Sequence, residues 1–184
     1  MADWSQIVNE HGPLVWRTAQ RLLQHEADTA DCFQRTFIAA LELSQRETIR
    51  DWPALLRRLA TARALEQLRK RMLDRGRFGA DGGKSGVDRR ADIKAIEPND
   101  AASAHELADH LRLALSQIEP LQAEVFCLAC LDDRSYAEIA RQLDITSNYV
   151  GVLLNRAKAA LRERLAAHEP RPAVRNADRR ANNG

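Results

Sequence analysis

The chain has 184 residues, of which 45% are hydrophobic and 29% are charged. This balance is typical of a folded globular protein and excludes the composition of a disordered one. No apolar run approaches the ~20 residues that a membrane-spanning helix needs, so no membrane span is predicted. The N-terminal residues lack a basic segment followed by an apolar core, which argues against a signal peptide. The three cysteines, an odd number, fit a reducing cytoplasmic compartment.

Positive charge is concentrated in one stretch of the chain. The formal net charge is only +2, yet residues 55–77 carry eight basic and two acidic side chains. A localised basic segment in a nearly neutral protein indicates contact with a polyanion. The alternative is a solvated helix face without a ligand, and composition alone does not separate the two.

Helical periodicity dominates and strand signals are nearly absent, which predicts an all-α fold. In the N-terminal half we expect helices over 14–23, from Glu26 to about 43, and from Trp52 to Leu73. The spacing i, i+3, i+4 predicts which side chains are buried. In the second helix these are Ala30, Phe33, Phe37, Ala40 and Leu41. In the third they are Leu55, Leu56, Leu59, Leu65, Leu68 and Leu73.

A glycine-rich stretch without apolar periodicity divides the chain into two helical domains joined by a flexible linker. The predicted domains and segments are residues 8–75, the linker 76–103, residues 104–167 and a disordered tail 168–184. Helices in the second domain are expected at roughly 104–118, 120–131, 135–143 and 147–166.

Two of these helices are joined by a short corner. Ser135 with Glu138 three residues later forms a capping-box signature. Ile145 is expected to fill the angle, and Thr146 or Ser147 to cap the next helix. The predicted inward face of that helix is Val150, Leu154, Ala157, Leu161 and Leu165. A short helix, a tight turn and a second helix with a polar leading face form a helix-turn-helix, which places the second helix in a DNA major groove. An αα-hairpin within a bundle is the alternative.

Both halves resemble a known family. The segments "EVF", "SYAEIA" and "RAK", within residues 124–158, resemble domain 4 of bacterial sigma factors. "DTADCFQRTFIAAL" and "WPALLRRLATARALEQLRKR" resemble sigma domain 2 and the helix that follows its core helix. Two small domains in this order resemble the extracytoplasmic-function (ECF) branch of the family. The resemblance covers about residues 8–75 and 104–167.

The resemblance implies a factor that directs promoter recognition and strand opening, with residue roles carried by the matching positions. Asp28, Asp31 and Gln34 would contact core RNA polymerase, whose β′ clamp and β subunits bind such factors. The loop 44–51 would accept a flipped base. The residues implied for the −10 element and the backbone are Arg58, Arg63, Arg69, Lys70 and Arg71. Those implied for the −35 element are Ser147, Asn148, Tyr149, Val152, Asn155, Arg156 and Lys158. The implied partners are core polymerase, promoter DNA and an anti-sigma factor; no cofactor, metal or catalytic residue is expected.

The recognition helix departs from the family pattern, because Gly151 and Leu153 stand where basic residues are usual. Two alternatives therefore stay open: a sigma mimic that sequesters an anti-sigma factor, and a stand-alone helix-turn-helix regulator. Cys127 and Cys130 form a C-x-x-C within an apolar helix, where buried core is a better interpretation than a metal site. Core positions are also expected for Phe37, Trp16 and Trp52.

Overall fold

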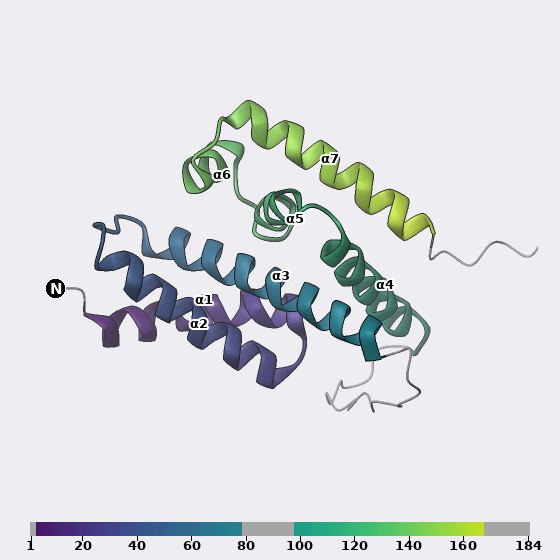
Figure 1. Cartoon of the computed structure of the whole chain (residues 1–184), viewed down its shortest axis with the longest axis horizontal. Helices are drawn as coiled ribbons and strands as arrows, with labels where there is room; N and C mark the ends of the chain where they lie inside the picture. Colours follow the sequence, from purple (N-terminus) through teal and green to yellow (C-terminus); the bar gives the residue numbers. More distant parts are fainter. Residues whose placement is uncertain (1–2, 79–97, 168–184) are drawn as a thin grey trace, which may run out of the picture.

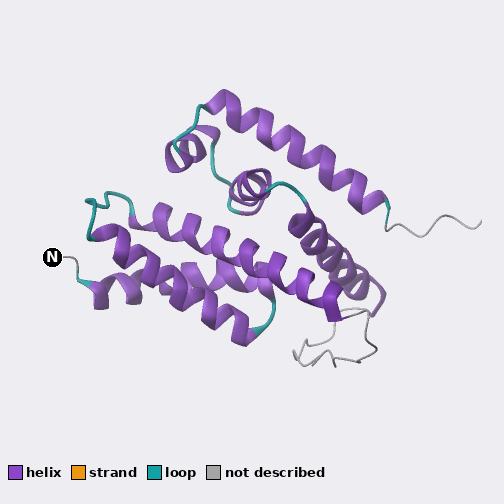
Figure 2. Cartoon of the chain, viewed as in Figure 1, coloured by secondary structure: helices purple, strands orange, loops and turns teal. Residues whose placement is uncertain are grey.

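The computed structural model describes residues 3–78 and 98–167, and every regular element in these ranges is a helix (Figures 1 and 2). The all-α prediction is therefore confirmed. The N-terminal module comprises α1 (Trp4–Leu23), α2 (Glu26–Ser44) and α3 (Trp52–Phe78). The C-terminal module comprises α4 (Pro98–Gln117), α5 (Pro120–Phe126), a π-helical segment (Cys127–Leu131), α6 (Tyr136–Leu143) and α7 (Ser147–Ala166). Among the described residues, no helix has the length and apolarity to cross a membrane.

Two helices begin earlier than predicted. α1 begins at Trp4 rather than near residue 14, because Asp3 caps it: its Oδ1 accepts a hydrogen bond of 3.1 Å from the backbone N–H of Gln6. Pro13 lies inside this helix without ending it. α4 begins at Pro98 rather than near residue 104. Most of the predicted linker and the whole predicted tail lie outside the described residues.

The buried face of α2 differs from the predicted stripe. Its fully buried side chains are Thr29, Cys32, Thr36, Ala39 and Ala40, whereas Phe33 and Phe37 pack only partly buried at the edge of the core. Leu41, predicted to be core, is 39% exposed. These small side chains allow the neighbouring helices to approach α2 closely. The hydroxyls of Thr29 and Thr36 each donate to a backbone oxygen one turn earlier, so both buried hydroxyls are hydrogen-bonded.

α3 is buried on two sides. It packs against α1 and α2 on one side and against α4 and α5 on the other (Figure 1). The predicted core positions Leu56, Leu65 and Leu68 are confirmed, but Leu73 is 69% exposed. A single apolar cluster includes residues of both modules: Ala19, Leu22, Leu23, Cys32, Ala64, Leu65 and Leu68 with Ala114, Leu115, Ile118, Ala123, Cys127, Ala157 and Leu161. The two modules therefore share a core, which the prediction of two separate domains did not include.

The core under the predicted corner belongs to the C-terminal module alone. It contains Val125, Leu128, Ile139, Ala140, Val150, Leu153 and Leu154. Ile145 packs against this cluster from the corner, as expected.

The leucines of α3 offer a matched test of this core. Leu56→Ala should lower the free energy of unfolding by about 2–5 kcal/mol, because Leu56 is fully buried and a cavity would remain. Leu73→Ala, on the same helix but exposed, should change it by less than about 0.5 kcal/mol. Urea denaturation followed by circular dichroism measures both values. Equal losses for the two variants would contradict the described packing of α3.

Candidate nucleic-acid interface

The first helix of the corner is fixed by the predicted capping box, which the structure confirms. The backbone N–H of Glu138 donates to Ser135 Oγ at 3.3 Å, and Glu138 Oε2 accepts from the Ser135 backbone N–H at 2.8 Å. The same oxygen accepts from the Ser135 hydroxyl at 2.7 Å, and Arg134 donates to Oε1 at 2.8 Å. The Ser135 hydroxyl, then its backbone N–H and Arg134, lower the pKa of Glu138 to about 2.

The turn between α6 and α7 is short and closed by backbone geometry. Asp144 ends α6 in the left-handed region with φ 53°, a conformation that Asp and Asn tolerate better than most residues. The N–H of Ile145 donates to the Ala140 carbonyl at 3.0 Å. Thr146, one of the two residues predicted to cap α7, is the N-cap. Its Oγ1 accepts a hydrogen bond of 3.2 Å from the backbone N–H of Tyr149. These contacts hold α7 at a fixed angle to α6.

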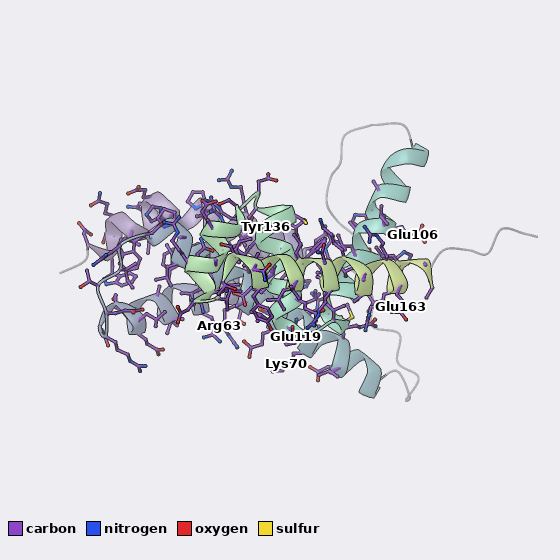
Figure 3. All side chains as sticks on the ribbon, turned by 90° about the horizontal axis from the view of Figure 1, so that it is seen from above. Arg63, Lys70, Glu106, Glu119, Tyr136 and Glu163 are labelled. Atoms are coloured by element: carbon purple, nitrogen blue, oxygen red, sulfur yellow. The ribbon has the colours of Figure 1, made fainter. Side chains whose placement is uncertain are left out.

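The leading face of α7 is open to solvent. Its exposed side chains are Ser147, Asn148, Tyr149, Val152, Asn155 and Arg156, and Lys158 is half-exposed. Tyr149 and Val152 are 41% and 38% exposed. Figure 3 shows α7 lying across the outer side of the molecule, from the end near Tyr136 to Glu163. All seven residues predicted for the −35 element thus lie on one helix, and none of them is more than half-buried.

Burial corrects one inference from the family pattern. Leu153 is only 2% exposed and belongs to the core under the corner, so it is not a lost base-reading position. A Cβ on Gly151 would lie 3.5 Å from the ring of Tyr136, which is ordinary contact. The departure from a basic recognition helix therefore concerns Gly151 rather than Leu153.

The five basic residues predicted on α3 do not form one surface. Arg63 and Lys70 lie on the same edge of the molecule (Figure 3), Lys70 exposed and Arg63 3.3 Å from Glu66 on its own helix. Arg71 faces the N-terminal module, where its Nη1 is 2.7 Å from Asp28 Oδ2. Arg58 and Arg69 face the C-terminal module: Arg58 Nε lies 3.7 Å from Glu124 Oε1, and Arg69 has buried guanidinium nitrogens without a hydrogen-bond partner. Lys70 is the exposed member of the set, the side chains of Arg58 and Arg63 are 43% and 42% exposed, and that of Arg71 is 31% exposed.

The residues predicted to contact polymerase have different environments on α2. Asp28 is half-buried and accepts from Gln67 Nε2 at 3.1 Å in addition to its ion pair with Arg71. Asp31 is paired along its own helix with Arg35 at 2.9 Å, and Gln34 is exposed. Asp31 and Gln34 are therefore accessible, whereas Asp28 joins α2 to α3.

A cavity occurs at the loop between α2 and α3. Its volume is about 470 Å³, and its lining residues are Ser44, Gln45, Arg46, Glu47, Thr48, Ile49 and Trp52. Trp52 closes one side and packs edge-to-face on Trp4, with ring centroids 5.3 Å apart. The volume lies in the range of small-ligand sites. Trp52 is thus a core anchor, as predicted, and part of the cavity wall.

Two predicted core residues are exposed. Cys127 is buried, and burial raises its thiol pKa to about 12, but Cys130 is exposed because the π-helical segment turns it outward. Trp16 is 37% exposed and packs on Phe33 only along one edge. The described residues contain no cluster of His, Cys, Asp and Glu that could hold a metal ion.

Sequence reasoning missed the polar residues at the junction of the modules. Arg21 on α1 donates through Nη1 to the Leu131 carbonyl and through Nη2 to Asp132 Oδ1, both at 2.6 Å. Arg57 on α3 has a lowered pKa because burial removes water from it, with Arg134 as the next cause. Nothing in the local sequence around Arg21 signals a partner more than a hundred residues away.

The chain resembles characterised proteins in both modules. Residues 7–73 match the family described as Sigma-70 region 2, and residues 109–161 match Sigma-70, region 4. The ECF RNA polymerase sigma factor SigE of Mycolicibacterium smegmatis is 28% identical over 170 residues, which is 91% of this chain but 63% of SigE. The chain thus spans less than two thirds of that relative. SigW of Bacillus subtilis is 24% identical over 165 residues, covering 88% of each protein.

A solved structure shares the fold. The sigma factor RpoE of Bartonella quintana, in complex with the anti-sigma factor NepR, superposes with a TM-score of 0.52 at 19% identity. The match covers 91% of this chain and 99% of that one.

The capping box predicts a pH-dependent stability. Because the folded pKa of Glu138, about 2, lies below the unfolded value near 4.3, its contribution is complete above about pH 4.3 and is lost as the pH falls towards 2. Glu138→Gln should therefore lower the melting temperature at pH 7, and the difference from the wild type should shrink below about pH 4. Glu163→Gln, an exposed change on α7, is the control and should leave the melting temperature unchanged at both pH values. A difference for Glu138→Gln that is constant with pH would rule out the ionic cap.

Proposed function

Because this chain belongs to the ECF branch of the sigma-70 family, we propose that it binds core RNA polymerase and directs promoter recognition and strand opening. One observation carries the proposal: a capped, tightly turned helix-turn-helix presents a solvent-exposed polar face on α7. The major groove of B-DNA is wide enough for one such helix. A stand-alone regulator would leave the match of residues 7–73 to Sigma-70 region 2 without a role.

The proposed contacts to the −35 element divide by chemistry. Ser147, Asn148 and Tyr149, at the N-terminal end of α7, would reach base edges, since this end of a recognition helix points into the groove. Val152 would offer an apolar contact to a thymine methyl group. The remaining three, Asn155, Arg156 and Lys158, would contact the phosphate backbone.

The proposed −10 contacts lie on the N-terminal module. The cavity of the loop at 44–52 would receive a base extruded from the duplex, whose unstacking costs a few kcal/mol. A site that binds the extruded base holds the strands apart. Lys70 would contact a phosphate first, because it is the exposed member of the basic set. Arg58 and Arg63, whose side chains are 43% and 42% exposed, would follow, and Arg69 and Arg71 would join them only if their present surroundings open.

Partners and cellular place follow from the family. Asp31 and Gln34, with Asp28 behind them, would form the surface on α2 that docks on the β′ clamp, and the C-terminal module would meet the β subunit. We place the protein in the cytoplasm, where polymerase acts, and propose a factor without catalytic activity of its own. The structural neighbour is bound to an anti-sigma factor, and regulation by such a partner is proposed for this chain too.

Binding to core polymerase is the first test. The purified chain should bind core polymerase and support transcription from a promoter library. Asp31→Arg should weaken binding at least tenfold, because it reverses a charge at the proposed contact, while circular dichroism shows an unchanged fold. Glu42→Arg, an exposed reversal on the same helix, should bind normally. Fluorescence anisotropy measures the affinities, and the absence of any binding by the folded wild-type chain would refute the proposed function.

The salt dependence of promoter binding tests the basic edge of α3. Lys70→Ala should weaken the complex of promoter with polymerase and this chain, and should reduce the slope of log K against log salt by about 0.9, the value for one lost phosphate contact. Arg17→Ala removes one positive charge on the exposed side of α1 and should leave the slope unchanged. Filter binding over a range of salt gives both slopes. A Lys70 variant with the wild-type slope would exclude this phosphate contact.

A further inference from the structure

The outward side of α7 carries a row of uncharged side chains. Residues three and four positions apart lie on one side of a helix, so Asn148, Val152, Asn155 and Ala159 line up along α7. All four are exposed, and the residues that α7 buries lie on the opposite side of the helix. From Ser147 to Leu154 the helix has no charged side chain. We call these four residues the uncharged row.

The first cations of α7 lie beside the uncharged row and not within it. Because an α-helix turns by about 100° per residue, Arg156 lies about 80° to one side of Asn148 and Lys158 about 80° to the other. Arg156 is exposed and Lys158 is half-exposed. A helix in the major groove has a sugar-phosphate backbone on each side. The two cations are therefore placed for phosphates, while the row between them faces the base edges.

The position without a side chain on the leading turns of α7 is bordered by a tyrosine of α6. A Cβ on Gly151 would lie 3.5 Å from the ring of Tyr136, and Tyr136 is 46% exposed. A phenol hydroxyl can donate to a phosphate oxygen, but it has no positive charge. Tyr136 therefore adds a neutral donor beside Gly151, where a guanidinium or ammonium group would be needed to read guanine.

The side chains at the start of the uncharged row match the chemistry of A·T base pairs. In the major groove adenine presents an acceptor, N7, and a donor, N6, and the carboxamide of Asn148 can pair with both. The methyl groups of Val152 can contact the C5-methyl group of thymine. Guanine presents two acceptors, N7 and O6, which Arg or Lys reads best. The hydroxyls of Ser147 and Tyr149 both donate and accept, so they do not choose between base pairs.

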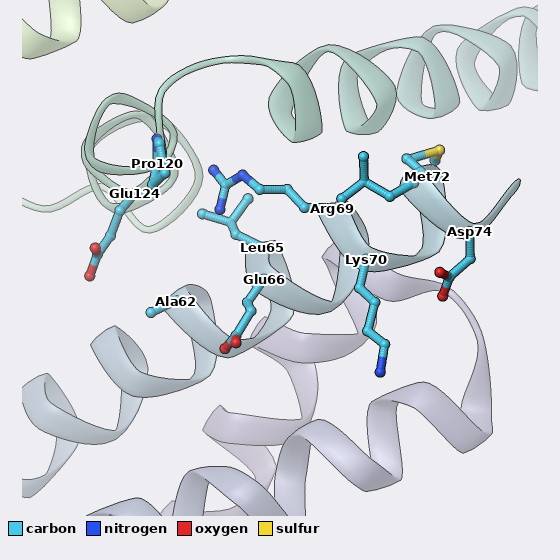
Figure 4. Close-up of a pocket in the computed structure, with 10 residues that line it drawn as sticks. Ala62, Leu65, Glu66, Arg69, Lys70, Met72, Asp74, Pro120 and Glu124 are labelled. Carbon is cyan, nitrogen blue, oxygen red and sulfur yellow. The ribbon is translucent and has the colours of Figure 1, made fainter. Parts of the chain in front are cut away.

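Attraction to the charge of DNA is supplied elsewhere in the chain. Residues 55–77 carry eight basic and two acidic side chains. Among them Lys70 is exposed and points away from Pro120 and Glu124 at the cavity of about 1000 Å³ beside α3 (Figure 4). Phosphate contacts contribute affinity without sequence information. Since α3 can supply this part of the affinity, the leading turns of α7 need no cations and can be selective.

We propose that α7 selects A·T base pairs in the −35 element, with Asn148 reading an adenine and Val152 a thymine methyl group, and that it does not read guanine. Asn155, about two turns beyond Asn148, stays with the phosphates, because the N-terminal residues of a recognition helix are the ones that reach base edges. This inference rests on the proposed function, since it names the class of DNA sequence that the −35 contacts would take.

The first test is selection from a promoter library randomised over the −35 element, bound by core polymerase together with the full chain. The wild type should enrich A·T pairs there, and Asn148→Ala should lose the preference for adenine at one position by about tenfold. Asn148→Arg should convert that position to guanine, because arginine pairs with N7 and O6. Loss of a merely structural role would not change which base is chosen. Glu163→Gln, exposed and far along α7, is the control and should select like the wild type.

Modified bases separate the two contacts. Deoxyuridine lacks the C5-methyl group of thymine, so it should weaken binding of the wild type several-fold and leave Val152→Ala unchanged, because both changes remove the same contact. 7-Deazaadenine lacks N7, so it should weaken the wild type and leave Asn148→Ala unchanged. Fluorescence anisotropy on matched promoter duplexes measures the four affinities of each pair. Penalties that simply add would exclude the contact in question.

Enrichment of guanine by the wild type, or an equal loss on every base for Asn148→Ala, would overturn the inference. A polymerase complex that opens promoters without a preference for A·T pairs in the −35 element would refute the inference and leave the proposed function intact. If the wild type does not bind polymerase, the proposed function fails. The same library is then selected with the free full-length chain, and the absence of A·T enrichment there counts against the inference separately.

Discussion

The burial of α3 on two sides is the constraint on which the rest of the structure depends. Leu56 and Ala60 complete the core with α1 and α2, while Leu65 and Leu68 enter the cluster shared with the C-terminal module. Apolar side chains thus occupy two faces of one helix, and its many cations are confined to the strips between them. This is why the basic segment, which looks uniform in the sequence, is divided in space into an exposed edge, an internal ion pair with Asp28 and a set held at the junction.

Charged side chains at the junction of the modules are buried at a cost in free energy. Glu124 has a raised pKa because burial disfavours its charge, although Arg58 opposes that shift. Arg57 is likewise poorly hydrated and has a lowered pKa. Neither group has the full set of hydrogen bonds that a permanent buried ion pair requires. Charged groups at the junction are therefore only partly compensated, and they oppose its burial rather than favour it.

Local signals predicted the C-terminal module well. The capping box at Ser135, the packing of Ile145 and the bounds of α7 were all readable, because they depend on residues within a few turns of one another. The buried face of α2 was harder to predict, because small polar residues stand there in place of large apolar ones. Thr29 and Thr36 can be buried because their hydroxyls hydrogen-bond to the backbone one turn earlier. The junction of the modules could not be predicted from one sequence. Arg21 and Asp132 have no local reason to be partners, and only the three-dimensional arrangement brings them together.

The π-helical segment Cys127–Leu131 limits how the chain can change in length. Its wider turns carry the Asp132 N–H back to the Cys127 carbonyl at 3.1 Å, and so determine where the Leu131 carbonyl faces. A π-helical turn holds one residue more than an α-helical turn, so the loss of a single residue here would be absorbed by a return to ordinary helical winding. The helix-turn-helix that follows would keep its orientation, but the carbonyl and the side chain that accept from Arg21 would no longer be presented in the same way. A change of length by one residue in this segment is therefore expected to disturb the contact with α1 more than the fold of the C-terminal module.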